Sequence, residues 1–442
     1  MAVFFRPSRH SDAFLKALPC VALCALTILS NPTSAASLAD EVSVLIETHN
    51  RVLAAQADEV AAREQIAVAK GDWNPEFSLT TSYGFERQVK GNDTSDTKMP
   101  PRDLSMSLTQ LLWDFGSTDA SIQKARLTHH QSEATLVSTR QSLILEGTSA
   151  YLEALRNQKL IQFARESVDN IRHQAELEDS RVQRGSGFTT DVLQAKTELA
   201  GAEARLVAAV GAFKVSANRY RAVFGHDPGP VEDMYAPMTP FAEIPETTEA
   251  TIEVALRNNP ALDAAATAAH IAREEINITQ ADEFYPRLDA TAESNFKKDA
   301  DGTVGEKSEG IFKVELNYDF NLGLTAFNTL KASEQSHLAS ERRYGDEKDR
   351  VEEQVRNAWD NLETARMRAE HLTNQANIAG EFLELAQRER ELGNRSLIDI
   401  LQAETRLINA NSDSTSARTD VALAVYNLLA AMGHLEVGVL AK

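Results

Sequence analysis

The chain has 442 residues, of which 65 are acidic and 45 are basic, so its formal net charge is −20. A chain this acidic repels nucleic acids and anionic membrane surfaces, and we expect no nucleic acid as a partner. Both cysteines, Cys20 and Cys24, lie near the N-terminus, so the rest of the chain holds no disulfide, thiolate metal site or cysteine nucleophile.

Residues 1–35 have the layout of a cleaved secretory signal. The basic residues at its start are Arg6, Arg9 and Lys16. A short apolar run, Ala17 to Leu29, follows, and Thr33-Ser34-Ala35 supplies the small residues of a cleavage site. The alternatives are an ordinary buried N-terminal helix and a lipid anchor on Cys24. No later stretch has the ~20 apolar residues of a spanning helix, so any membrane segment is expected to be β.

Residues 38–72 are rich in Ala, Glu and Val, lack proline and predict a helix. Trp73-Asn74-Pro75 ends it, because proline disfavours helical backbone in the preceding residue. Apolar and polar residues then alternate, from Phe77 to Glu86 and from Leu104 to Thr109. This alternation predicts strands with one apolar face, and hence a β-hairpin at about 77–115.

A very long helix is predicted next, from Ser117 to Arg184, where there is no proline and a single glycine. At 1.5 Å per residue it would be on the order of 100 Å long. A helix of that length is stable only when it packs sideways on others, as in a coiled coil. Gly185-Ser186-Gly187 ends it, and Thr190–Val223 is the second helix of a tight antiparallel hairpin.

The same elements recur after a proline-rich connector, residues 227–247. They are a helix at 253–283, a break at Phe284-Tyr285-Pro286, a β-hairpin at about 287–320, a long helix at Leu324–Leu392, a turn at Gly393-Asn394 and a helix at Ser396–Ala431. Both β-hairpin tips, Lys90–Arg102 and Lys298–Glu309, are polar and are expected to be solvent-exposed loops.

A direct repeat marks the duplication. Asp191-Val-Leu-Gln-Ala-Lys-Thr197 recurs 208 positions later as Asp399-Ile-Leu-Gln-Ala-Glu-Thr405, with five of seven residues identical. Gly185 and Gly393 recur at the same offset. We therefore divide the chain into a first repeat at 36–226, the connector at 227–247, a second repeat at 248–433 and a tail at 434–442.

The hairpin strands are long enough to cross a bilayer, which takes ~9–11 tilted residues. Aromatic residues near their ends would suit the two membrane interfaces. They are Trp73, Trp113, Phe284, Tyr285 and Tyr318. Four strands cannot close a barrel, and lipid forbids an open edge, so we expect an oligomer. Two copies would leave little room for a channel, so a conducting barrel needs at least three. The alternative is a soluble, half-buried sheet.

These features together resemble the TolC-like outer-membrane efflux proteins. The resemblance rests on the two helix–β-hairpin–helix-hairpin units, on Asn74-Pro75 and Gln110-Leu-Leu-Trp-Asp-Phe-Gly116 around the first β-hairpin, and on an aspartate six residues after each glycine turn. It implies an α+β, mostly α fold and a homotrimer, with a twelve-stranded transmembrane β-barrel continued by a long periplasmic α-helical barrel. The implied partners are a periplasmic adaptor, an inner-membrane transporter of the ABC or RND type and outer-membrane lipid.

The resemblance also implies an aperture at the helical end. Asp399 matches the gating acid of the family, Arg395 a basic residue that locks the closed state, and Asp191 the acid of the first repeat. Gln194 and Gln402 stand where some members have a second acid, and Arg390 stands where an aromatic residue is expected. The turns that would meet an adaptor hold Gly185, Gly187, Gly393 and Asn394.

Residue spacing supports part of this assignment. Arg395 and Asp399 are four residues apart, and Asp399 and Gln402 are three apart, which predicts one shared helical face. Three copies would place six carboxylates, from Asp191 and Asp399, around one constriction that attracts cations. The alternative is that both aspartates simply cap their helices, and the two roles are compatible.

No enzyme motif is present, and no cofactor or metal is expected. His129 and His130 are adjacent, so they point in different directions on a helix. The sequence thus predicts an outer-membrane exit duct for small-molecule efflux, type I protein secretion or both. The rival is a periplasmic adaptor or coiled-coil scaffold, although adaptors usually carry a single helix hairpin.

Overall fold

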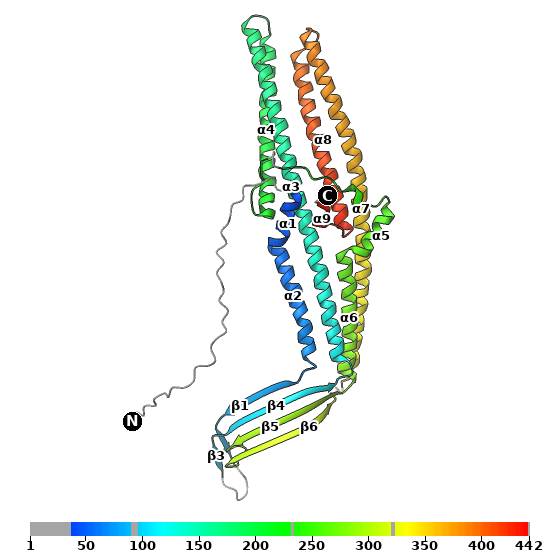
Figure 1. Cartoon of the computed structure of the whole chain (residues 1–442). Coiled ribbons are helices and arrows are strands. Elements are labelled where there is room, and N and C mark those ends of the chain that lie inside the picture. Colours follow the sequence, from blue (N-terminus) through cyan, green and yellow to red (C-terminus); the bar gives the residue numbers. More distant parts are fainter. Residues whose placement is uncertain (1–36, 90–95, 231–233, 320–322, 441–442) are drawn as a thin grey trace, which may run out of the picture. The chain divides into compact units, whose positions relative to one another are not determined.

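The computed structural model describes residues 37–89, 96–230, 234–319 and 323–440 (Figure 1). The expected signal at 1–35 and part of the first hairpin tip, residues 90–95, lie outside these ranges. In the described part of the chain, no helix is both long and apolar enough to cross a membrane.

The first predicted helix, 38–72, is in fact two helices, α1 (Leu38–Thr48) and α2 (Asn50–Gly71). His49 separates them with extended backbone, and its Nδ1 accepts a hydrogen bond from the Arg51 N–H at 3.1 Å. A side chain that caps the next helix in this way competes with continuation of the previous one. The prediction of one helix was therefore wrong.

The second half breaks at the matching place. α5 (Thr248–Asn258) and α6 (Pro260–Phe284) meet at Asn259, whose side-chain oxygen accepts hydrogen bonds from two N–H groups at the start of α6. Pro260 stands at the first helical position, where its missing N–H costs nothing. The single helix expected at 253–283 is thus also divided.

Four antiparallel strands form one sheet in the order β1 (Glu76–Tyr83), β4 (Arg102–Trp113), β5 (Arg287–Lys298) and β6 (Glu306–Asn317). The pairing of β4 with β5 joins the two repeats. Two short strands, β2 (Glu86–Gln88) and β3 (Thr97–Met99), pair separately.

The second hairpin tip is shorter than expected. Lys298 still belongs to β5, and β6 already begins at Glu306, so the predicted loop Lys298–Glu309 shrinks to residues 299–305. The Lys298 ammonium lies 2.7 Å from the Glu306 carboxylate of the opposite strand. This ion pair stabilises the pairing of β5 with β6 close to the hairpin tip, where the residues are polar.

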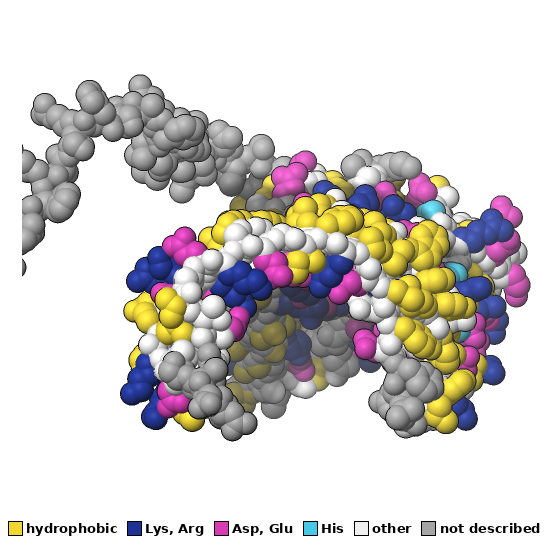
Figure 2. Space-filling view, turned by 90° about the horizontal axis from the view of Figure 1, so that it is seen from below, with side chains coloured by type: hydrophobic (Ala, Val, Ile, Leu, Met, Phe, Trp, Pro, Cys, Tyr) yellow, Lys and Arg dark blue, Asp and Glu magenta, His cyan; other side chains and the backbone are white. Residues whose placement is uncertain are grey.

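The two faces of the sheet differ in chemistry. Phe77, Leu108, Ala292 and Phe312 lie in register across the four strands and form an apolar row. On the other face, Ser82, Asp103, Lys297 and Lys307 form a polar row. Figure 2 shows hydrophobic side chains along the outer side of the curved sheet and charged side chains on its inner side.

The motif that leaves the first hairpin holds the strand-to-helix junction together. The Gln110 side-chain amide donates to the Trp73 carbonyl at 2.8 Å and thereby ties β4 to the break after α2. The buried Asp114 carboxylate accepts from the N–H groups of Gly116 at 3.1 Å and Thr118 at 2.7 Å. These bonds satisfy N–H groups at the start of the long helix that would otherwise lack partners.

The long helices agree with the prediction to within one residue at each end. They are α3 (Ser117–Gln183), α4 (Thr189–Phe224), α7 (Thr325–Glu391) and α8 (Leu397–Ala431). α3 packs on α4, α6, α2 and α8, and α7 packs on α8 and α6 (Figure 1).

The main hydrophobic core lies midway along the long helices. Its largest side chains include Tyr151 of α3 and Tyr426 of α8, and both are almost fully buried. Tyr151 also binds the connector, because its hydroxyl donates to the Tyr235 carbonyl and accepts from the Tyr235 N–H, each at 3.1 Å. Two short helices, η2 (Phe241–Glu243) and α9 (Val437–Leu440), complete the described elements.

Candidate functional site

Both glycine turns end a long helix in the same way. Gly185 has φ +78° and Gly393 has φ +81°, in the left-handed region where only glycine is free of strain. The Ser186 N–H bonds to the Arg181 carbonyl, and the Asn394 N–H bonds to the Glu389 carbonyl, both at 2.9 Å. This pattern is the Schellman motif, so each turn is fixed by local backbone chemistry.

The turns face solvent in the described chain. Gly185, Gly393 and Asn394 are exposed, and a Cβ at either Gly185 or Gly393 would meet open space. Gly187 is different, because its Cβ would lie 3.1 Å from a Val182 methyl carbon and 3.2 Å from the Val182 nitrogen. Close packing, and not a left-handed backbone, therefore favours glycine at position 187.

Asp191 and Asp399 occupy equivalent places, each at the third position of its helix. Neither is the N-cap residue itself. Ser396 caps α8: its hydroxyl accepts from the Asp399 N–H at 3.3 Å and donates to the Asp399 carboxylate at 2.7 Å. α4 begins after Phe188, which offers no side-chain cap, and in the described chain the Asp191 carboxylate has no hydrogen-bonding or ionic partner.

Arg395 does not share a helical face with Asp399, and that prediction was wrong. Because Ser396 caps the helix, α8 begins only at Leu397, and Arg395 lies in the turn before it. The Arg395 Nε bonds to the Glu389 carboxylate at 2.6 Å, and its guanidinium carbon lies 5.3 Å from the centre of the Phe382 ring. Its partners within the chain are therefore residues on the other side of the turn.

The two repeated segments meet in one small hydrophobic cluster. Ala195 of α4 and Leu401 of α8 pack with Val168 and Ile171 of α3. Gln194 and Gln402 point away from this cluster and are exposed. Among the described residues, no hydrogen bond or ion pair joins Asp191, Asp399 and Arg395 to one another.

A buried ion pair near the turns was missed by the sequence analysis. Glu178 of α3 is 4% exposed and accepts from Arg181 at 2.8 Å and from Arg390 of α7. This contact joins the first repeat to the second one and gives Arg390 a defined role at the position where the resemblance implied an aromatic residue. Glu178 and Arg390 are 212 residues apart, and neither belongs to a repeated motif, so no local signal could pair them.

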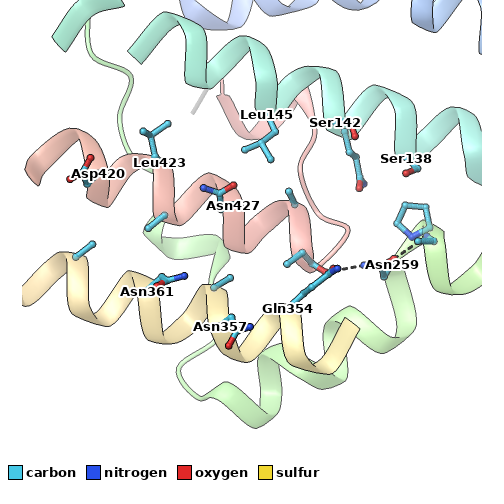
Figure 3. A pocket seen from close by; sticks show the side chains of 18 residues that line it. Ser138, Ser142, Leu145, Asn259, Gln354, Asn357, Asn361, Asp420, Leu423 and Asn427 are labelled. Atoms are coloured by element: carbon cyan, nitrogen blue, oxygen red, sulfur yellow. Dashed lines mark hydrogen bonds between the residues drawn. The ribbon is translucent and has the colours of Figure 1, made fainter. Parts of the chain in front are cut away.

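A pocket of about 680 Å³ lies away from the turns, between α3, α6, α7 and α8 (Figure 3). Neutral amides and hydroxyls line it, including Asn357, Asn361 and Asn427. Asp420 is the only ionisable side chain in the described lining, and it lies 3.6 Å from both Arg156 and Arg368. The pocket thus offers no acid–base pair for catalysis.

Comparisons with known proteins agree with this architecture. The sequence matches the profile of the family described as outer membrane efflux protein over residues 42–226 and 251–434. It is 28% identical to outer membrane protein TolC of Vibrio cholerae over 427 residues, which is 95% of this chain and 96% of TolC. It is 24% identical to the alkaline protease secretion protein AprF of Pseudomonas aeruginosa, covering 89% of this chain and 84% of AprF.

Solved structures show the same fold. The outer-membrane channel OprN superimposes with a TM-score of 0.77 at 18% identity, covering 90% of each chain. The outer membrane protein VceC of Vibrio cholerae gives 0.75 at 17% identity, covering 91% of this chain and 99% of VceC. None of these relatives supports the alternative of a periplasmic adaptor. The chain belongs to the outer membrane efflux protein family and is an exit duct of the outer membrane.

Proposed function

We propose that three copies of this chain close a twelve-stranded β-barrel in the outer membrane, with the helices continuing it as a periplasmic duct. The open sheet is the observation that carries this proposal. In the described chain, β1 and β6 each have one neighbour in the four-stranded sheet, which leaves two edges unpaired. Its apolar face, with Phe77 62% and Phe312 76% exposed, suits lipid, and its polar face suits a water-filled lumen.

The outer face of α4 supports the same assembly. Leu193 and Val207 are two heptads apart and are both largely exposed, as is Val215. Exposed apolar residues along a helix are stabilised when another helix packs on them, and the described part of the chain supplies no helix to cover these. A neighbouring copy would supply one.

We further propose that the glycine turns form the periplasmic aperture. Asp191, Gln194, Asp399 and Gln402 would line the ring, and Arg395 would hold it closed. The support is position: all five residues lie within about two helical turns of Gly187 or Gly393. The partly exposed carboxylates are available to attract cations.

The turn residues Gly185, Gly187, Gly393 and Asn394, of which Gly187 is only partly exposed, would then meet the tips of a periplasmic adaptor that links the duct to an inner-membrane transporter. The names of the family and of one relative indicate the cargo class: the family is named for efflux, and AprF is named for protease secretion. We propose export of small molecules, secreted protein or both, with the choice made by the transporter.

Cysteine cross-linking tests the barrel. One cysteine is placed in β1 and one in β6, scanned over the residues of the polar face, in a chain that has no cysteine after residue 24. Oxidation should join separate chains into dimers and trimers. The matched control is Ser78→Cys with Ser107→Cys, whose hydroxyls are 2.8 Å apart within one chain and should give no increase in size. A protein that remains monomeric at every position of the scan would overturn the trimer.

Single-channel recording in planar bilayers tests the aperture. Asp399→Ala combined with Arg395→Ala should raise conductance and reduce cation selectivity. Asp413→Ala, at an exposed aspartate further along α8, is the control and should change neither. An unchanged conductance in the double variant would remove these residues from the gate without affecting the barrel proposal.

A further inference from the structure

A histidine and two glutamates from two helices converge outside the aperture. Glu59 lies on α2, and His129 and Glu133 lie on α3. Glu59 is buried and the His129 side chain is 18% exposed, whereas Glu133 opens to solvent. The sequence analysis did not predict this cluster, because Glu59 and His129 are 70 residues apart and only helix packing joins them.

The donor atoms are spaced for one metal ion. The His129 Nε2 lies 2.6 Å from a Glu59 carboxylate oxygen and 3.9 Å from a Glu133 carboxylate oxygen, and the three donor atoms all lie within 4.8 Å of one another. Ligands of a single ion with bonds of ~2.0–2.2 Å lie about 3–3.5 Å apart. The donor-to-donor distances must therefore change by less than about 2 Å, a change that side-chain rotation can supply.

The helix geometry pre-orients two of the ligands. His129 and Glu133 are four residues apart on α3, so they project from the same face, and α2 presents Glu59 from across the helix interface. Two facing helices that each supply inward ligands are the usual construction of metal sites in helical bundles.

We propose that Glu59, His129 and Glu133 bind a divalent transition-metal ion of the Zn²⁺ and Co²⁺ class. One imidazole and two carboxylates suit these ions better than Mg²⁺ or Ca²⁺, which prefer all-oxygen sites. Water would complete the coordination on the exposed side, at Glu133. A bound ion would tie α2 to α3 and stiffen the part of the helical bundle between the sheet and the core.

Arg63 competes with the metal. Its guanidinium bonds to the same Glu59 oxygen at 2.6 Å, and its side chain is 59% exposed, so it can turn into solvent when an ion binds. Removing this positive charge should tighten metal binding. If His129 only forms a stabilising ion pair at the helix interface, no metal should bind, whether Arg63 is present or not.

The test uses the full-length protein, without a histidine tag, in detergent, and Co²⁺ as a spectroscopic probe. We expect one Co²⁺ per chain, seen as d–d absorption and by titration calorimetry. His129→Ala and Glu59→Gln should each weaken binding about tenfold or more, since even partners outside the coordination shell contribute that much. Arg63→Gln should strengthen it.

The neighbouring histidine provides the control. His130 faces α6, where its Nδ1 lies 3.3 Å from the Thr267 hydroxyl, so His130→Ala should leave Co²⁺ affinity unchanged. Glu133→Gln alters an exposed side chain and is expected to fold normally, so it tests the site even if the buried variants are unstable. Absence of stoichiometric Co²⁺ binding, or equal losses in His130→Ala and His129→Ala, or an unchanged affinity in Glu133→Gln, would overturn the proposal.

Discussion

The two helix hairpins carry nearly the same sequence at their tips but place it in different surroundings. Leu193 of the first repeat is 62% exposed, whereas its counterpart Leu401 is fully buried. The equivalent pair three residues further on differs too, because Lys196 is exposed and Glu404 is buried. The reason lies in the neighbours: α8 packs against both α3 and α7, whereas α4 packs mainly against α3.

This difference shows that a sequence repeat predicts local structure but not burial. The glycine turns are alike because local backbone bonds set them. The surroundings of the helices that follow depend on which elements the other repeat brings alongside. In the second hairpin Leu401 and Glu404 are buried, whereas in the first Leu193 and Lys196 remain on an outer surface that is available to another copy of the chain.

Removing the Glu178–Arg390 ion pair between the two helix hairpins should have the largest effect on the free energy of unfolding. Arg390→Leu leaves the buried Glu178 with only the exposed Arg181 as partner, and removing one member of a buried pair costs about 3 kcal/mol of unfolding free energy. Arg388→Leu is the control, because Arg388 and Glu384 form an exposed pair on one helix, worth roughly 0.5 kcal/mol or less. Urea unfolding in detergent measures both, and similar losses would contradict the assigned role of Arg390.

The burial contrast itself can be tested with one pair of substitutions. Leu401→Ala removes a fully buried side chain and should cost roughly 2–3 kcal/mol, since it leaves a cavity in the cluster with Ile171 and Ala195. Leu193→Ala should cost less than half of that when the chains are dissociated, because only a neighbouring copy would cover Leu193. Equal costs in dissociated chains would contradict the burial contrast.

The first residues of α4 and α8 differ in whether a side chain caps the helix, and changing these caps should alter stability by a smaller amount. Ser396→Ala removes the N-cap of α8 and should cost about 1 kcal/mol, while Phe188→Ser supplies the cap that α4 lacks and should add up to about 1 kcal/mol. Thermal unfolding should therefore shift in opposite directions for the two variants. A shift in the same direction would show that the 75% exposed Phe188 ring has a packing role outside the described chain.

The contribution of Glu404 to the stability of the folded chain should depend on pH. Burial is the main cause that raises the pKa of Glu404, so in the folded chain this carboxyl binds its proton more tightly than the unfolded value of about 4.3. Stability is then lost as the pH rises from about 4 through the raised pKa. Glu404→Gln should match the parent protein at acid pH and exceed its stability at neutral pH. A constant difference across that range would contradict a buried, titrating carboxyl.

The sequence predicted the strands, the long helices and the turns well, because each is marked by a pattern of residues close together in the chain. Alternation marked the strands of the four-stranded sheet, absence of proline marked α3 and α7, and Gly185 and Gly393 marked the turns. The helix breaks at His49 and Asn259 were missed, since a capping side chain inside a helical pattern is a weak signal. The candidate site was only partly predictable: Glu178 meets Arg390, and Arg395 meets Glu389, only once helices and turns have been placed.

The pairing of β4 with β5 has a consequence for biogenesis. Thr109 pairs with Thr291, so this ladder closes across more than 180 residues, most of which form the first helix hairpin and the connector. Contacts of such long range form slowly, because the closure entropy of the intervening chain opposes them. Until the second half has been delivered, β4 presents an apolar strand edge that is prone to aggregation. This strand edge is therefore expected to stay unpaired until both halves of the chain have been delivered.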